Sequence, residues 1–330
     1  MSDIRNKILQ LLNYMNSKII GQEDLNKKLM ITLLADGHAL VEGAPGLAKT
    51  KAIKTLSSMI NAKYNRIQFT PDLLPSDITG SDIYIADKGE FEFRAGPVFA
   101  NLVLADEINR APAKVQSALL EAMAERQVSI GGKRYTLPEL FMVMATQNPI
   151  EHEGTYNLPE AQLDRFLMYI KINQPNSEAE KKILRLVRNE NKVACGTDTE
   201  CWEDKGQKEP KIAIKDVLEA RAAIYDIHMS DAIEEYLVQL IMATRHPEKY
   251  AEDLKGMILF GASPRATIAL DRCACINAWL DGRDFVTPED IHAVVYDILR
   301  HRIILSFEAQ AEGITTDEVI LKVIQSVPLP

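Results

Sequence analysis

The sequence predicts an α/β fold, in which a mainly parallel sheet flanked by helices is followed by a smaller helical domain. The length of 330 residues exceeds the roughly 100–200 residues of a typical domain, which favours two domains. Short apolar runs alternate with helical patterns in the first half of the chain, whereas helical patterns dominate the second half. We therefore expect a first domain over residues 1–175 and a second domain, beginning with a linker, over residues 176–330.

The chain begins with an amphipathic helix, followed by a strand, a loop and a helix. Apolar residues recur at helical spacing over residues 4–16, which predicts the first helix. Residues 38–42 form a short apolar run that stops at a glycine-rich segment, and helical spacing resumes over residues 49–60. We therefore expect residues 43–48 to connect a strand to a helix.

Further apolar runs predict strands that are buried on both faces, as in a parallel sheet. They cover residues 66–69, 102–105, 140–145 and 166–170, with a helix over residues 114–126. Two inserts alternate apolar and polar residues around glycine-containing turns, which is typical of β-hairpins. The inserts span residues 84–93 and 128–137.

A polar stretch over residues 189–211 has no apolar period and predicts a linker or a long loop. The patterns that follow are helical and make up a small second domain, which ends in a short strand-like tail. The expected helices cover residues 213–228, 231–245, 264–281 and 288–303.

Charge and cysteine content argue against several classes of protein. The 38 basic and 47 acidic side chains give a net charge of -9, which is unfavourable for a general binder of nucleic acid or anionic membrane. The N-terminal residues do not form a signal peptide, and no run reaches the roughly 20 apolar residues that span a bilayer. Four dispersed cysteines are too few for a disulfide framework. We expect a soluble, cytoplasmic protein with no membrane span.

The strongest chemical signal is the glycine-rich loop between the first predicted strand and its helix. Successive backbone N–H groups of such a loop form an anion nest at the helix N-terminus. Lys49 then reaches the terminal phosphates of a nucleotide, and the Thr50 hydroxyl binds magnesium. The strict pattern has glycine in place of Ala48, and the alternative is a turn without a ligand. The candidate binding residues are Gly43, Ala44, Pro45, Gly46, Leu47, Ala48, Lys49 and Thr50.

Polar residues follow two later strands, at the edge where ligands bind in open α/β sheets. Asp106 and Glu107 follow the run 102–105, where one carboxylate can hold magnesium and the other can orient and deprotonate water. Asn148 follows the next strand, and its amide can sense a γ-phosphate or position water. The alternatives are exposed carboxylates at a strand end and an ordinary Asn-Pro turn.

Two arginines complete the set of candidate residues. Arg165 precedes the last predicted strand, where it can act as an arginine finger toward a neighbouring subunit or pair with Asp164 at the surface. Arg265 lies in the first turn of a helix capped by Ser263. A cation is unfavourable at this end of a helix, so we expect an anion to meet Arg265. The alternative is an ordinary first-turn arginine.

Taken in order, these segments resemble those of AAA+ ATPases, and most closely those of the MoxR branch. One such motif is modest evidence, but six in order are highly specific. The likeness covers nearly the whole chain, and alanine at the position of Ala48 is usual in this branch. The matching segments are residues 20–22, 42–50, 104–111, 145–149, 160–166 and 261–266.

The resemblance implies a P-loop NTPase (AAA+) core with β-hairpin inserts and a C-terminal helical lid, which binds ATP and Mg²⁺. It also implies a role for each matching residue. The roles are Walker A for Lys49 and Thr50, Walker B for Asp106 and Glu107, sensor 1 for Asn148, arginine finger for Arg165, sensor 2 for Arg265, and adenine contact for Gly21.

The same resemblance implies a homo-oligomeric ring, commonly a hexamer, with ATP bound between subunits. MoxR-like ATPases resemble chaperones that mature or activate other protein complexes. Their partner often carries a von Willebrand factor A domain. We therefore expect an ATPase that remodels a protein client, and whose second domain closes over the nucleotide through Arg265.

Two other functions use the same motifs. A DNA-acting motor is suggested by Lys133 and Arg134 at the tip of the second hairpin, although the net charge of -9 argues against nucleic acid as a partner. A nucleotide-switched scaffold without useful hydrolysis needs neither Glu107 nor Arg165. The presence of both therefore favours an active ATPase.

Overall fold

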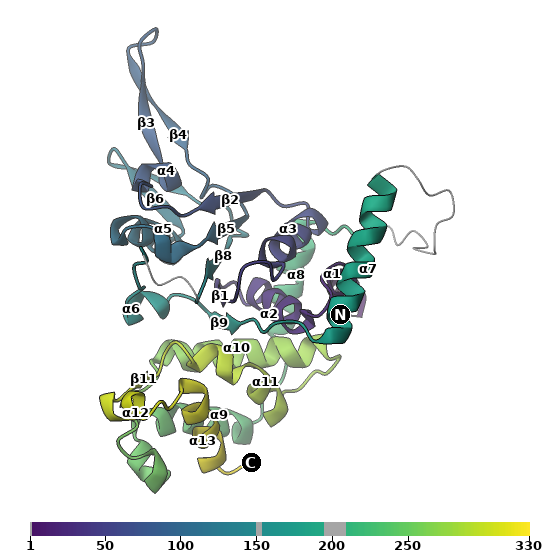
Figure 1. The fold of residues 1–330 in the computed structure, drawn as a ribbon, viewed down its shortest axis with the longest axis vertical. Coiled ribbons are helices and arrows are strands. Elements are labelled where there is room, and N and C mark those ends of the chain that lie inside the picture. Colours follow the sequence, from purple (N-terminus) through teal and green to yellow (C-terminus); the bar gives the residue numbers. More distant parts are fainter. Residues whose placement is uncertain (1, 150–153, 195–208) are drawn as a thin grey trace.

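The computed structural model describes residues 2–149, 154–194 and 209–330 (Figure 1). It confirms the predicted α/β architecture, with a parallel sheet of five strands in the order β2-β5-β8-β1-β9. The strands are β1 (Ala39–Glu42), β2 (Tyr64–Gln68), β5 (Leu102–Asp106), β8 (Met142–Gln147) and β9 (Met168–Lys171). The strand carrying the glycine-rich loop therefore lies inside the sheet.

Helices cover both faces of the sheet, which explains why its strands are apolar on both sides. Along β1, Ala39 and Val41 belong to the apolar cluster that contains α1, α2 and α3, whereas Leu40 between them belongs to the cluster that contains α4 and α5. Successive side chains of a strand point to opposite faces, so each strand contributes to both clusters. These helices are α1 (Ser2–Lys18), α2 (Glu23–Leu34), α3 (Lys49–Met59), α4 (Pro75–Thr79) and α5 (Ala113–Glu125).

Both predicted inserts are antiparallel β-hairpins. The first extends away from the body of the protein and is longer than predicted (Figure 1). Phe93 of the first hairpin stacks on Tyr135 of the second with their ring centroids 3.8 Å apart, so the two inserts support each other. The strands are β3 (Gly80–Ile85), β4 (Glu90–Ala95), β6 (Gln127–Ile130) and β7 (Lys133–Thr136).

The second half of the chain is helical, as predicted, with a small two-stranded sheet. Part of the expected linker is instead helical, because α7 continues to Ala194; residues 195–208 lie outside the described residues. The elements are α7 (Ser177–Ala194), α8 (Ile214–Ile224), α9 (Asp231–Arg245), β10 (Ile258–Phe260), α10 (Pro264–Leu280), α11 (Pro288–Leu299), β11 (Ile304–Leu305), α12 (Phe307–Ala311) and α13 (Thr316–Ser326).

The prediction of a strand-like tail is wrong beyond β11, because the chain ends in α12 and α13. Val319, Ile320 and Val323 are fully buried, and their spacing suits one face of a helix rather than one face of a strand. The Thr315 hydroxyl accepts a hydrogen bond from the Glu318 N–H, and the Glu318 carboxylate accepts one from the Thr315 N–H. This capping box starts the helix.

The two halves of the chain share one apolar cluster rather than packing as separate bodies. It runs from α1, α2 and α3 into α8 and α10, and α8 packs directly on α1 and α2 (Figure 1). The helical half is therefore held against the sheet-bearing half by buried apolar surface. In the described residues, no helix is long and apolar enough to cross a membrane.

A buried histidine ties the start of β1 to its neighbours. The Nδ1 atom of His38 accepts a hydrogen bond from the Val143 N–H at 3.0 Å, which places the ring proton on Nε2, 3.4 Å from the Met123 carbonyl oxygen. Burial is the main cause that lowers the pKa of His38, from 6.5 to about 4. The folded protein therefore keeps this ring neutral at pH values where the unfolded chain protonates it.

We expect the free energy of unfolding to fall as the pH falls from about 6.5 toward 4, because only the unfolded state then gains a proton at His38. The contribution is full above pH 6.5 and decreases by at most about 1.4 kcal/mol per pH unit. His38→Asn keeps an acceptor for Val143 but cannot titrate. Urea unfolding at several pH values should give a flatter dependence for this variant, and an unchanged dependence would contradict the assignment.

Candidate nucleotide-binding site

The loop between β1 and α3 has the backbone shape of an anion-binding turn. Gly46 and Ala48 adopt positive φ angles of 86° and 56°, and α3 begins at the next residue, Lys49. Left-handed residues turn consecutive N–H groups to one side of the loop, and the N-terminus of a helix adds further unpaired N–H groups. The loop therefore offers donors to a phosphate group from its own backbone.

Residues from three strand ends surround one cavity of about 370 Å³ beside this loop. The loop itself follows β1, Asp106 and Glu107 lie at the end of β5, and Asn148 follows β8. The Lys49 ammonium donates a hydrogen bond to the Gly43 carbonyl oxygen at 2.7 Å, across the mouth of the loop. The structure thus brings together most of the predicted binding and catalytic residues, namely Pro45, Gly46, Leu47, Ala48, Lys49, Thr50, Asp106, Glu107 and Asn148.

The Asp106 carboxylate is bound at both oxygen atoms. Oδ1 accepts a hydrogen bond from the Thr146 hydroxyl at 2.6 Å, and Oδ2 accepts two from the Arg66 guanidinium at 2.7 and 3.1 Å. Asp106 and Thr50 present hard oxygen atoms to the same cavity, as a magnesium site requires. These oxygen ligands fit Mg²⁺, although the Arg66 guanidinium already pairs with the Asp106 carboxylate.

Glu107 lies beside Asp106 with a left-handed φ angle of 57°. Its Oε2 atom accepts hydrogen bonds from the Gln68 side-chain amide at 2.8 Å and from Arg110 at 3.1 Å. Its backbone N–H donates to the Thr146 hydroxyl, which in turn donates to Asp106. The two acidic residues are thus held in one network.

This network also includes three residues that the sequence did not predict as part of the site, namely Arg66 and Gln68 of β2 and Thr146 of β8. One signal was present, because Gln68 ends a strand whose register pairs it with Asp106 in the next strand. Polar residues at aligned strand ends lie at the same edge of a parallel sheet. The pairing of β2 with β5 has to be known before this signal can be used.

A second cavity, of about 320 Å³, lies beside Gly21, where the resemblance places the adenine. It is lined by residues 21–25 and 170–176, together with Ala179. Gly21 has a φ angle of +76°, and a Cβ atom there would lie 2.9 Å from the Cβ of Ala179, so this position requires glycine. Ile172 lines this cavity and also packs against Gly43, which belongs to the loop between β1 and α3 (residues 43–48, the phosphate loop). The cavity therefore adjoins the phosphate loop.

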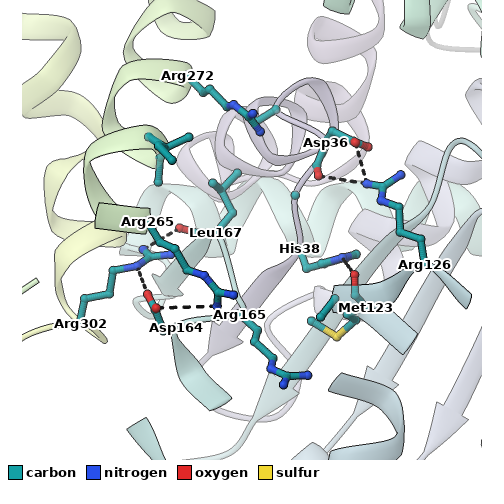
Figure 2. Close-up of a pocket in the computed structure, with 15 residues that line it drawn as sticks. Asp36, His38, Met123, Arg126, Asp164, Arg165, Leu167, Arg265, Arg272 and Arg302 are labelled. Carbon is teal, nitrogen blue, oxygen red and sulfur yellow. Dashed lines mark hydrogen bonds and ion pairs between the residues drawn. The ribbon is translucent and has the colours of Figure 1, made fainter. Parts of the chain in front are cut away.

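Arg165 and Arg265 lie in a different cavity, of about 270 Å³, between the sheet-bearing half and the helical half (Figure 2). Among the described residues, none lines both this cavity and the one beside the phosphate loop. The structure therefore places these two arginines outside the cavity beside the phosphate loop of their own chain. Three further arginines line the cavity, namely Arg126, Arg272 and Arg302.

Acidic residues offset part of the positive charge of this arginine cavity. Asp36 pairs with Arg126 at 2.7 Å, and Asp164 pairs with Arg302 at 2.7 Å and with Arg265 at 3.8 Å (Figure 2). Burial lowers the pKa of the Arg302 guanidinium, an effect that its hydrogen bond to Asp164 and the charge of Asp164 oppose. The cavity nevertheless keeps an excess of arginines, which suits an anionic partner.

Comparison with known proteins finds a family match in each of two parts of the chain. Residues 38–168 match the ATPase family associated with various cellular activities (AAA), and residues 251–323 match the AAA lid domain. Chaperone MoxR1 of Mycobacterium tuberculosis is 45% identical over 94% of this chain and 79% of its own length. Protein MoxR of Methylorubrum extorquens is 31% identical over 100% of this chain and 97% of its own.

A solved structure from Cytophaga hutchinsonii, of a protein assigned as an ATPase, has the same fold. It superimposes with a TM-score of 0.87 at 45% sequence identity, covering 99% of this chain and 96% of that chain. The arrangement of the sheet-bearing and helical halves is therefore shared with an experimentally determined relative.

The left-handed alanine in the phosphate loop leads to a prediction about stability. We expect Ala48→Gly to raise the free energy of unfolding by about 0.5–1 kcal/mol, because the strain of a left-handed alanine, about 1–2 kcal/mol, exceeds the added entropy of glycine in the unfolded chain. Ala52→Gly, inside α3, is the matched control and should lower it by about 1 kcal/mol or more. Urea unfolding measures the free energy of unfolding of both variants. An equal decrease in the two would show that Ala48 is not strained.

Proposed function

The chain belongs to the MoxR family of AAA+ ATPases, and on that premise we propose that it binds ATP with Mg²⁺ beside the phosphate loop and hydrolyses it between subunits of a ring. The observation that carries this proposal is the cavity where Lys49, Thr50, Asp106, Glu107 and Asn148 meet. Phosphate-binding, metal-binding and water-activating groups are all present within it.

The residues around the loop suit a nucleoside triphosphate. The N–H groups at the start of α3 and the Lys49 ammonium bind the phosphates, and the cavity beside Gly21 receives the base. Thr50 and Asp106 hold Mg²⁺, which neutralises phosphate charge when it is bound. Lys49 exchanges the Gly43 carbonyl oxygen for a phosphate oxygen in this arrangement.

Hydrolysis needs a group that orients and deprotonates the attacking water. Glu107 serves as this base, and the Asn148 amide positions the water or the terminal phosphate. In the structure, Gln68 and Arg110 both donate to Glu107 Oε2, so these bonds hold the carboxylate beside the cavity.

Arg165 and Arg265 complete the site of a neighbouring subunit in this proposal. Their cavity shares no described lining residue with the phosphate loop, and Arg265 is 59% exposed. A ring supplies such a neighbour, and a hexamer is the commonest ring in the family. An arginine that approaches from another subunit stabilises negative charge in the transition state of phosphoryl transfer.

The energy of hydrolysis drives remodelling or maturation of a protein client in the cytoplasm, in keeping with the chaperone name of the relative from Mycobacterium tuberculosis. A protein with a von Willebrand factor A domain is the proposed partner.

The alternative of a DNA motor rests on Lys133 and Arg134, which are exposed on the β6–β7 hairpin. Salt-sensitive binding to DNA would favour that alternative over a protein client.

We expect Glu107→Gln to bind ATP with unchanged affinity but to lower kcat by about 10²- to 10⁴-fold, because the amide cannot accept the proton of the attacking water. Glu312→Gln, an exposed substitution of the same kind on the other half of the chain, is the control. Fluorescent-nucleotide titration and steady-state turnover separate binding from chemistry. Rapid turnover by Glu107→Gln would rule out its assigned role.

Completion of the site by a neighbour predicts that two inactive variants restore each other. Lys49→Ala lacks the phosphate-binding lysine and Arg165→Ala lacks the finger. In a random equimolar ring, about a quarter of the interfaces combine an intact loop with an intact finger, so we expect about a quarter of wild-type activity. Specific activity of the wild type should also rise with protein concentration. No recovery on mixing would argue for sites complete within one chain.

A further inference from the structure

We propose that Asp164 and Arg302 form a positioning pair that holds Arg165 and Arg265 in one fixed arrangement, so that both arginines reach the nucleotide of a neighbouring subunit together. The pair would act through these arginines and would not itself touch the nucleotide. This inference rests on the proposed function, because it concerns the same site, in which Arg165 and Arg265 complete the nucleotide site of a neighbouring subunit.

Asp164 joins the segments that carry the two arginines. It directly precedes Arg165 in the sheet-bearing half. Its carboxylate accepts hydrogen bonds from the Arg302 Nε at 2.7 Å and from the Ser263 hydroxyl at 3.1 Å, and lies 3.8 Å from Arg265 (Figure 2). The last three residues belong to the helical half, and Ser263 precedes the helix that carries Arg265. One carboxylate therefore fixes both segments.

Arg302 anchors this carboxylate from below the surface. Its side chain is 3% exposed and also donates hydrogen bonds to the carbonyl oxygens of Phe166 at 2.7 Å, Leu167 at 3.1 Å and Ile298 at 2.6 Å. A planar guanidinium can satisfy several acceptors at once, which a lysine ammonium cannot do in the same geometry. Arg302 thus binds both the side chain of Asp164 and the backbone that follows Arg165.

The residues before Arg302 strengthen the same junction. The His301 Nε2 lies 3.0 Å from the Phe166 carbonyl oxygen, and the Arg300 guanidinium donates to the Tyr169 carbonyl oxygen at 2.8 Å. Three consecutive side chains of the helical half therefore grip one short backbone segment of the other half. The helical half cannot rotate away from Arg165 without breaking several buried hydrogen bonds.

The two arginines need such support because of their own charge. Arg265 is 59% exposed, and Arg165 is exposed and held by a hydrogen bond from its Nη1 atom to the Leu120 carbonyl oxygen at 2.7 Å. Like charges in one cavity repel each other before an anion arrives. The carboxylate of Asp164 offsets this repulsion, and a displacement of even about 1 Å at such a position can cost about 10²-fold in rate.

The test compares kcat and KM of the wild type with those of Asp164→Asn and Arg302→Lys. We expect kcat to fall by about 10- to 100-fold in both, with KM for ATP and ring assembly, measured by size-exclusion chromatography, unchanged. Arg283→Lys is the matched control, because Arg283 pairs at 2.5 Å with the fully buried Asp290 inside the helical half. It should lose stability but keep its kcat.

A second experiment separates a positioning role of Asp164 from a purely structural one. It introduces the Asp164 substitution into a variant that lacks both arginines. In a protein that already carries Arg165→Ala and Arg265→Ala, Asp164→Asn should not lower kcat further, because the groups it positions are gone. A further fall of equal size in this background would overturn the proposal. Ser263→Ala, which removes one hydrogen bond to Asp164, should lower kcat several-fold and replaces Asp164→Asn if that variant does not fold.

The outcomes separate this inference from the proposed function. If Arg165→Ala leaves kcat unchanged, the proposal that a neighbouring subunit completes the site is wrong. The positioning pair is then wrong as well. In another outcome, Arg165→Ala and Arg265→Ala lower kcat while Arg302→Lys and Ser263→Ala keep the wild-type value. This result would leave the site shared between subunits in place and overturn only the positioning pair.

Discussion

Alignment of neighbouring parallel strands is the constraint on which the candidate phosphate site depends. Glu42 pairs with Gln147 and Gln68 pairs with Asp106, so the residues at these strand ends lie at the same level of the sheet. Loops far apart in the sequence therefore open into one cavity. A shift of one residue in a strand would turn its side chains to the opposite face and remove both the buried clusters and the site.

The sequence predicted those features that depend on local pattern. The strands, the glycine-rich loop and both hairpins follow from periodicity and turn residues, which act over a few positions. The helical tail was missed because Val319, Ile320 and Val323 are too few to establish a helical period, and their burial depends on other helices. Arg66 and Gln68 were missed because their partners lie on another strand, and no local pattern specifies that pairing.

The candidate site shows the same limit. The phosphate-loop residues and Asp106 could be placed together from the fold class, because parallel strands share an edge. The position of Arg265 could not, because it depends on how the helical half docks. That docking is set by the apolar cluster shared with α1 and α2, and by the contacts of residues 300–302 with the start of β9.

The network around the two acidic residues also determines the charge that the cavity beside the phosphate loop presents to an anion. Asp106 and Glu107 alone would present two negative charges, but Arg66 and Arg110 neutralise them within hydrogen-bond distance. The N-terminus of α3 and the Lys49 ammonium add positive charge to the same cavity. Charge compensation between these side chains thus lowers the repulsion that a phosphate group would meet in this cavity, while the carboxylates stay beside it.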